Sequence, residues 1–120
     1  MEFDTLLRQA EQALMELDAE SIVALYSPDF LYEDIASGER ITNKPELRAY
    51  FDRLFALPDV SFTEVTFFSM GNRAAGRWTW SGSSLQSGDK YAIRGASLFI
   101  LGEGGIEEEI VYYDPRSFSA

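Results

Sequence analysis

The sequence contains no cysteine and no histidine among its 120 residues. The absence of cysteine excludes a disulfide framework and any chemistry that depends on a thiol. Without histidine, a zinc site and a histidine-based catalytic triad are both strongly disfavoured. Proton-transfer chemistry in this chain would therefore have to use carboxylates, tyrosines, lysines or water.

Basic residues are also scarce, because ten lysines and arginines stand against twenty acidic residues and give a formal net charge of −10. This charge repels phosphate backbones and anionic membrane surfaces, so we expect neither a nucleic acid nor a membrane as a partner. No apolar run approaches the roughly 18 residues of a membrane-spanning helix. The opening segment MEFDTLLRQ lacks the basic flank and apolar run of a signal peptide. These features predict a soluble protein of the cytoplasm.

Internal repeats, linkers and low-complexity segments are absent as well, and 120 residues are too few to build two separate cores. We therefore expect a single domain that spans residues 1–120. Apolar residues make up 46% of the chain, with nine Phe, six Tyr and two Trp, and this composition excludes intrinsic disorder. The domain is predicted to fold around an aromatic-rich core without covalent cross-links.

The first half of the chain has the pattern of three helices and one short strand. Apolar residues recur from Phe3 to Leu17 with the spacing of an amphipathic helix, and Ala19 to Tyr26 is a second, shorter helix that Asp18 can cap. Phe30 to Asp34 has the pattern of a strand. A third helix is predicted over residues 43–57, because it begins with Asn-Lys-Pro and proline fits the first helical turn.

Strands follow in the second half, over Val60 to Met70, Arg73 to Ser83, Tyr91 to Leu101 and Ile106 to Asp114. The alternation slips near Glu64, as a β-bulge would cause, and Gly95 is a second place where a strand can bend. Helices that precede a meandering antiparallel sheet of four long strands indicate an α+β fold. If the sheet is strongly curved and wraps around the helices, it leaves a conical cavity with apolar walls, which favours a small apolar ligand.

The opposite face of this sheet must be either covered or polar. Thr63, Arg77, Thr79 and Ser81 are expected on that face. Their mixed polar character suits a partly wet interface between two copies of the chain. A homodimer that forms through the sheet face is therefore predicted.

A resemblance to a known family rests on three stretches: SIVALYSPDFLYEDIASGER, the strand around Trp78-Thr79-Trp80, and the ending LFILGEGGIEEEIVYYD. They resemble the SnoaL-like branch of the NTF2-like superfamily, which includes ketosteroid isomerase, polyketide cyclases and limonene epoxide hydrolase. The resemblance covers nearly the whole chain. It implies an NTF2-like (cystatin-like) cone of three N-terminal helices packed in a strongly curved, mainly antiparallel sheet. It also places Asp34 on the isomerase's general base, within IVALYSPDFLYED.

The same resemblance implies that the electrophilic groups of the isomerase are missing. Ala10 stands where the isomerase has an oxyanion-donating tyrosine, and Ala96 where it has a protonated aspartate. Phe51 replaces a supporting tyrosine, although Tyr50 is adjacent. Because oxyanion stabilisation often supplies several kcal/mol of rate acceleration, steroid isomerisation is not expected of this chain.

Two aspartates are candidate catalytic groups. Asp34 shares its strand phase with Phe30 and Tyr32. It is either a turn-capping carboxylate without a chemical role or a general base at the mouth of the cone, where apolar walls would raise its pKa. Asp114 shares its phase with Tyr112 and is either a strand-end residue or a second pocket acid. If both acids face the cavity, their proximity would raise the pKa of one of them.

The candidate ligand-binding residues are aromatic, and each has the alternative of serving only in the core: Tyr32, Tyr50, Phe51, Trp78, Trp80 and Tyr112. The tyrosines could donate hydrogen bonds to a ligand carbonyl. Arg94 is either an outward-facing charge or the pocket's cation. The run Glu107-Glu108-Glu109 is expected to be solvated or to protect the sheet edge.

Two classes of function fit these observations. One is an enzyme without cofactor or metal, in which Asp34 moves a proton on a small apolar carbonyl or epoxide substrate, as an isomerase, cyclase or hydrolase does. The other is a non-catalytic module that uses the same cone for ligand binding or dimerisation. Because one fold hosts many activities, the resemblance alone does not choose between them.

Overall fold

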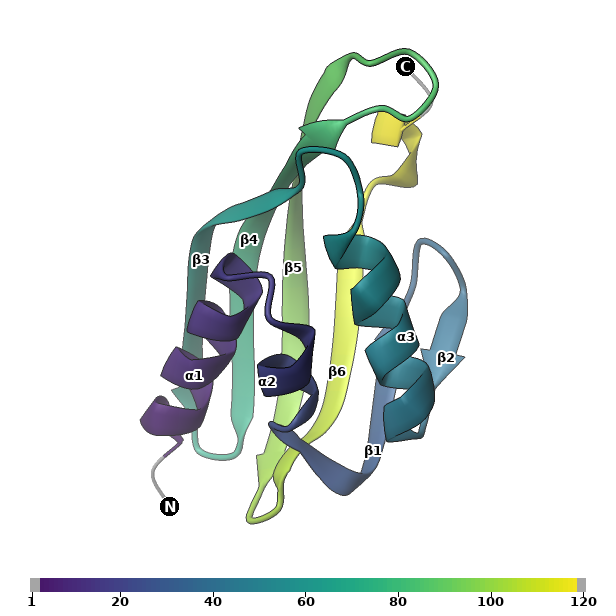
Figure 1. Cartoon of the computed structure of the whole chain (residues 1–120). Coiled ribbons are helices and arrows are strands. Elements are labelled where there is room, and N and C mark those ends of the chain that lie inside the picture. The colour runs from purple at the N-terminus through teal and green to yellow at the C-terminus, as the bar shows by residue number, and fades with distance from the viewer. Residues whose placement is uncertain (1–2, 119–120) are drawn as a thin grey trace.

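The computed structural model describes residues 3–118, so two residues at each end of the predicted domain 1–120 lie outside the described residues. In chain order the elements are α1 (Asp4–Met15), α2 (Ala19–Val23), β1 (Tyr26–Asp34), β2 (Glu39–Ile41), α3 (Lys44–Phe55), β3 (Ser61–Met70), β4 (Arg73–Ser83), β5 (Lys90–Gly102), β6 (Gly105–Tyr113) and the 3₁₀ helix η1 (Pro115–Phe118). The three α-helices lie against one face of a single sheet (Figure 1). This arrangement confirms the predicted α+β class.

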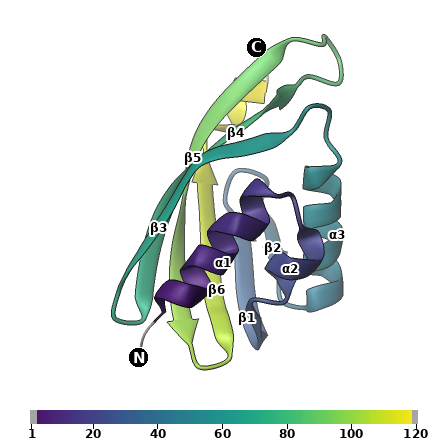
Figure 2. The same ribbon diagram turned by 60° about the vertical axis from the view of Figure 1, so that its left-hand side comes forward.

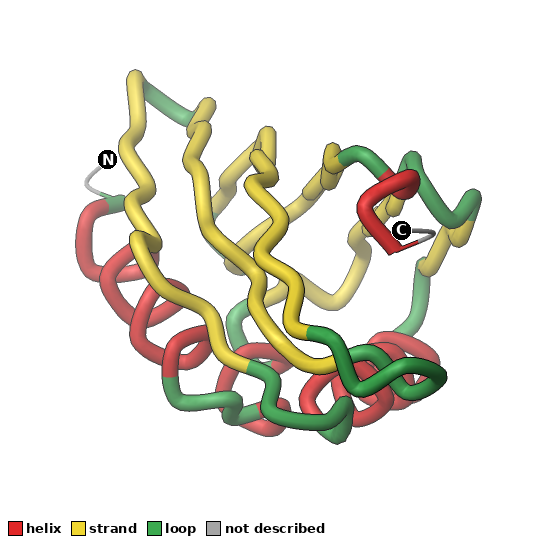
Figure 3. The backbone as a smooth tube through the Cα atoms, turned by 90° about the horizontal axis from the view of Figure 1, so that it is seen from above, coloured by secondary structure: helices red, strands yellow, loops and turns green. Residues whose placement is uncertain are grey.

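The sheet has six strands in the order β2-β1-β6-β5-β4-β3. Neighbouring strands are antiparallel except for β1 and β6, which run parallel. The sheet bends around the helices (Figure 2), and the view from above shows strands and helices on opposite sides of the interior (Figure 3). The predicted irregularity near Glu64 is confirmed, because its φ is 53° and the β3–β4 register shifts between Thr63 and Thr66.

Two strands differ from the prediction. The second helix ends at Val23, and Tyr26, expected to be helical, begins β1. Pairing with β6 explains this change, because Tyr26 lies opposite Ile106 and the Ile106 N–H donates to the Leu25 carbonyl at 2.8 Å. The three-residue strand β2 was not predicted, and it pairs antiparallel with the end of β1. A sheet of four antiparallel strands is therefore corrected to six strands with one parallel pair.

The predicted helix starts are confirmed by their capping bonds. The Asp18 carboxylate accepts a hydrogen bond from the Ser21 N–H at 3.0 Å, and the Asn43 side-chain oxygen accepts one from the Glu46 N–H at 3.0 Å. Both bonds satisfy backbone donors that have no partner within the first turn. The cap of α3 matters for the site, because this helix directs Tyr50 and Phe51 toward the sheet.

The core fills the space between the helices and the concave face of the sheet. Leu7 of α1, Leu47 of α3, Leu101 of β5 and Ile106 of β6 are among its most deeply buried side chains. Within residues 3–118, no helix has the length and apolar character needed to cross a membrane. The cytoplasmic location remains a prediction.

Candidate functional site

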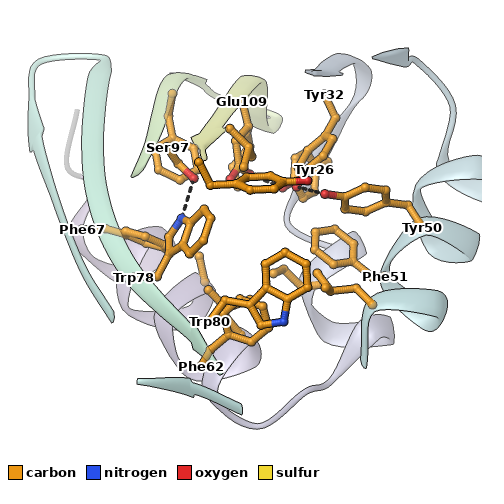
Figure 4. A pocket seen from close by; sticks show the side chains of 18 residues that line it. Tyr26, Tyr32, Tyr50, Phe51, Phe62, Phe67, Trp78, Trp80, Ser97 and Glu109 are labelled. Carbon is orange, nitrogen blue, oxygen red and sulfur yellow. Dashed lines mark hydrogen bonds between the residues drawn. The ribbon is translucent and has the colours of Figure 1, made fainter. Parts of the chain in front are cut away.

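A cavity lies between the helices and the concave face of the sheet, and 18 residues from eight elements line it (Figure 4). Ten of these residues are aromatic, so we call it the aromatic cavity. The space in which the centre of a water molecule fits is about 40 Å³. Because one water occupies roughly 10–15 Å³ by this measure, the cavity is narrow and suits a compact ligand.

Strand alternation explains which side chains reach the cavity. On β4, Trp78 and Trp80 point inward, while Arg77, between Gly76 and Trp78, is exposed on the opposite side. Trp78 lies across Gly95 of β5, where a Cβ atom would approach the indole to 2.1 Å. Gly95 therefore provides the room that the indole needs to lie flat against β5.

Five of the six predicted ligand-binding residues line the cavity: Tyr32, Tyr50, Phe51, Trp78 and Trp80. All five are buried. The sixth, Tyr112, is 42% exposed and is not among the lining residues. The prediction that Tyr112 faces the pocket is wrong, because the inward phase at the end of β6 belongs to its neighbour Tyr113.

The structure also places Asp114 and Arg94 outside the aromatic cavity. Asp114 is exposed and forms an ion pair with Arg116 at 2.9 Å, and this pair lowers the pKa of Asp114. The placement of Asp114 as a second pocket acid is therefore wrong, and the strand-end alternative describes it. Arg94 is exposed and not among the lining residues, so it is an outward-facing charge.

Asp34 is buried beside the cavity, behind two tyrosines that line it. Its Oδ2 atom accepts hydrogen bonds from the Tyr50 hydroxyl at 2.9 Å and the Tyr113 hydroxyl at 3.0 Å. Its Oδ1 atom accepts one from the Ser37 N–H at 3.1 Å. One oxygen of Asp34 therefore caps the turn after β1, as predicted, and the other accepts hydrogen bonds from two phenols, while its role as a general base stays a prediction.

The tyrosines extend this network toward the centre of the cavity. The Tyr32 hydroxyl donates to the Tyr50 hydroxyl at 3.2 Å (Figure 4). Burial raises the pKa of Tyr50 far above its ordinary value, and the neighbouring Asp34 charge raises it further. The same two causes raise the pKa of Tyr113. All three phenols therefore keep their protons at neutral pH and act as hydrogen-bond donors.

A second carboxyl group, Glu109 of β6, lines the cavity itself. Glu109 is 8% exposed, and its carboxyl accepts a hydrogen bond from the Tyr26 hydroxyl. Burial raises its pKa to about 7, although hydrogen bonds with Tyr26 and Ser97 partly offset that effect. The prediction that Glu109 is solvated is wrong, whereas Glu107 of the same run is exposed.

The phase of the strand provides a signal that could have identified Glu109. Glu109 alternates with Val111 and Tyr113, and all three line the cavity. Ile106 is also buried, because the β5–β6 register shifts between Ile106 and Glu108 and leaves Glu107 as an extra residue. Alternation counted back from Tyr113 assigns Glu109 to the cavity face, which is correct. Alternation counted forward from Ile106 assigns it to the outer face, which is wrong.

On the neighbouring strand β5, the side chain that faces the cavity is Ser97. It is not Ala96, which the resemblance places at the position of the isomerase's protonated aspartate. Ala96 lies on the outer side of β5, between Gly95 and Ser97, and is not a lining residue. Ser97 is 1% exposed and faces the cavity, where its hydroxyl oxygen accepts a hydrogen bond from the Trp78 indole N–H at 3.1 Å (Figure 4). The cavity therefore contains a polar wall of Ser97, Glu109 and Tyr26.

Comparison with known proteins identifies both a family and a fold. The family model described as a SnoaL-like domain matches residues 7–112 of this chain. A search of curated proteins found no match.

Several solved structures share the fold. A hypothetical protein from Catenulispora acidiphila with a ketosteroid isomerase-like fold, solved in complex with trimethylamine, has a TM-score of 0.83 and 18% identity over 96% of this chain and 89% of that one. A polyketide cyclase candidate from Pseudomonas putida has a TM-score of 0.82 and 20% identity, over 98% and 96%. An NTF2-like protein of unknown function from Cytophaga hutchinsonii has a TM-score of 0.75 and 14% identity, over 100% and 96%. Identities this low establish the fold and not an activity.

Proposed function

The chain belongs to the SnoaL-like domain family, and from that premise we propose that it binds a small, largely apolar organic molecule in the aromatic cavity and transfers a proton there, with Asp34 as the proton acceptor. The observation that carries this proposal is the Asp34 carboxylate, buried behind two tyrosines whose hydroxyls donate to it and whose rings line the cavity. A buried carboxylate of this kind can serve as a base for a molecule in the cavity, because bulk water does not reach it.

Asp34 would act through a phenol, because Tyr50 and Tyr113 stand between it and the cavity. A proton from a C–H bond of the ligand moves to the Tyr50 oxygen as the Tyr50 proton moves to Asp34 Oδ2, and the ligand keeps the electron pair of the broken bond as its conjugate base. Tyr50 is unchanged by this exchange, and Asp34 becomes a carboxylic acid. The two transfers must be concerted, because the raised pKa of Tyr50 makes a free phenolate unfavourable at neutral pH.

Replacing Asp34 tests the catalytic part of this proposal. Exchange of the α-hydrogens of cyclohexanone in D2O, followed by proton NMR, measures proton transfer on an apolar carbonyl compound. We expect wild-type protein to accelerate this exchange and Asp34→Asn to lower the acceleration by about 100-fold or more. Asp114→Asn is the matched control, because Asp114 is exposed and pairs with Arg116 outside the cavity, and this variant should accelerate the exchange as much as wild-type protein does.

A non-catalytic binding module is the second candidate. It is favoured by the position of Asp34, which is not among the lining residues and whose two oxygens already accept three hydrogen bonds. If wild-type protein exchanges ketone hydrogens no faster than buffer, yet its tyrosine NMR signals shift on ligand addition, the binding module is correct and the acid–base role is not.

We also propose that two copies of the chain pair through the outer face of the sheet, which is the face turned away from the helices. The predicted polar residues of this face are joined by a row of apolar residues, Phe68, Ala75, Leu98 and Ile110, which lie opposite one another on four adjacent strands. Phe68 is 64% exposed and Leu98 is 49% exposed in the single chain. An apolar row in the middle of a polar face is typical of a protein interface.

A further inference from the structure

The lining of the aromatic cavity has an unusual balance of charge. Glu109 is its single carboxyl group, and none of the 18 lining residues is a lysine or an arginine. Asp34 adds a second buried acid just behind the wall, since it pairs with Val111 while Tyr32 pairs with Glu109. The cavity therefore has one carboxyl group in its lining, a second behind it and no cation among its own lining residues.

The groups that face Glu109 are neutral near pH 7. Tyr26 and Tyr32 of β1 lie beside it, and burial together with the Glu109 charge raises the pKa of each well above its ordinary value. Tyr50 of α3, the next phenol in the network, also has a raised pKa, and Ser97 of β5 does not titrate. Glu109 is thus the lining group whose charge changes around neutral pH, and none of the other 17 lining residues is a cation that compensates that charge.

Aromatic rings surround the space in several orientations. Trp80 and Tyr113 meet nearly edge to face, with centroids 5.6 Å apart and planes at 81°, and Trp78 and Tyr113 have centroids 6.3 Å apart with planes at 59°. Rings that differ this much in orientation present both faces and edges to the cavity that they line (Figure 4). The faces of such rings attract cations, most strongly those of tryptophan.

We propose that the ligand of the aromatic cavity is a small organic cation, an ammonium group with apolar substituents, for which Glu109 is the counter-ion. This inference rests on the proposed ligand-binding function, but it does not depend on proton transfer by Asp34. The apolar substituents would replace water against the aromatic walls, and the ammonium group would compensate the one lining charge that has no basic partner among those 18 residues.

The charge state of Glu109 gives this proposal a distinctive pH dependence. A cation favours ionised Glu109, so its binding displaces the proton that Glu109 carries below about pH 7, and its affinity rises as the pH increases through that value. A neutral apolar ligand favours the protonated carboxyl, so its affinity changes in the opposite direction. The affinity for a cation therefore rises with pH, whereas the affinity for a neutral ligand falls, and this difference in sign can be measured.

The test compares choline with its neutral isostere 3,3-dimethylbutan-1-ol, in which carbon replaces the charged nitrogen. Isothermal titration of the full chain at pH 8 should show choline binding at least about tenfold tighter, or roughly 1.4 kcal/mol. Choline affinity should fall between pH 8 and pH 6, and titrations in buffers of different ionisation enthalpy should show proton release at pH 6. Glu109→Gln should remove the preference for choline and leave the affinity for the neutral isostere equal or higher.

Equal or tighter binding of the neutral isostere to wild-type protein would overturn the cation assignment while leaving the proposed apolar-ligand function intact. Failure of both probes to bind overturns the cation assignment too, and ketone exchange then reports on the proposed function separately. Because the comparison of the two probes is made on wild-type protein, it does not depend on the folding of the variant. Glu107→Gln is the matched control, since Glu107 is the exposed member of the same acidic run.

Discussion

At the scale of single residues, a missing side chain is as important to the site as those that are present. Gly95 has no Cβ, and the Trp78 indole occupies the position where one would be. In turn, the indole nitrogen reaches Ser97, which belongs to the polar wall of the cavity. The position of one glycine therefore determines where both a ring face and a hydrogen-bond donor lie.

We expect Gly95→Ala to destabilise the protein by about 1–3 kcal/mol, the usual cost of adding a methyl group to a filled interior. Urea unfolding followed by tryptophan fluorescence measures this change. Combining Gly95→Ala with Trp78→Phe should cost less than the sum of the two single changes, because the smaller ring makes room for the methyl group. Strict additivity of the two changes would show that the indole and Gly95 do not compete for the same space.

Strand alternation assigns some residues of the site to the correct face and others to the wrong one, for a physical reason. Asp34, Tyr32 and the two tryptophans could be placed by alternation, since their strands are regular around them. Alternation counted from Ile106 misplaces Glu109, because one extra residue on β6 reverses the phase between them, and only the phase of Val111 and Tyr113 gives its face correctly. Unlike the slip near Glu64, this bulge lies within three consecutive glutamates and changes no visible alternation, so the residues beyond it are assigned to the wrong face.

At the scale of secondary-structure elements, α3 connects local sequence to the site. Its start is fixed by Asn43, and one and two turns later it presents Leu47 and Tyr50 to the interior. The helices could be predicted from the sequence, because caps, proline positions and helical periodicity are local signals. The strand β2 could not be predicted, because three residues with one buried side chain carry almost no pattern. Its pairing depends instead on β1 lying beside it.

Asn43→Ala should destabilise the protein by about 1 kcal/mol, because the Glu46 N–H loses its acceptor at the start of α3. Chemical denaturation measures the change in the free energy of unfolding. Thr42→Ala is a suitable control, since Thr42 is the exposed residue immediately before the cap. A similar loss for both variants would mean that the effect comes from the loop and not from the cap.

At the scale of the whole molecule, the buried Glu109 couples stability to pH. Its pKa is about 7 when folded, against an ordinary value of 4.5, so the folded state holds a proton that the unfolded state releases between these values. The stability contributed by this group is fully present below pH 4.5 and is lost as the pH rises through about 7. The contribution of Glu109 to the free energy of unfolding should therefore be larger at pH 5 than at pH 8.

The comparison with Glu109→Gln isolates this contribution, because the other carboxyl groups titrate alike in both proteins. The difference in unfolding free energy, wild type minus variant, should increase by roughly 3 kcal/mol from pH 8 to pH 5, at 1.36 kcal/mol per pKa unit. Urea titrations at several pH values measure this difference. A difference that stays constant across the range would show that Glu109 is solvated or paired with an unrecognised cation.

The outer face of the sheet gives a second prediction for the whole molecule. If two copies pair there, light scattering should report about 27 kDa, twice the 13.5 kDa of one chain. Leu98→Glu introduces a charge in the centre of the apolar row and should give a monomer with an unchanged circular dichroism spectrum. Glu103→Lys, in the exposed turn between β5 and β6, should leave the mass unchanged. A wild-type mass of 13.5 kDa would refute the dimer.

The parallel pairing of β1 with β6 has a consequence for synthesis. β1 ends at Asp34, while its partner begins only at Gly105, so the two strands leave the ribosome far apart in time. Until β6 emerges, nascent chains expose one edge of β1 and lack the wall that carries Glu109. We infer that the aromatic cavity is completed late in synthesis. Truncation before β6 should leave an unpaired strand edge, and such edges promote aggregation.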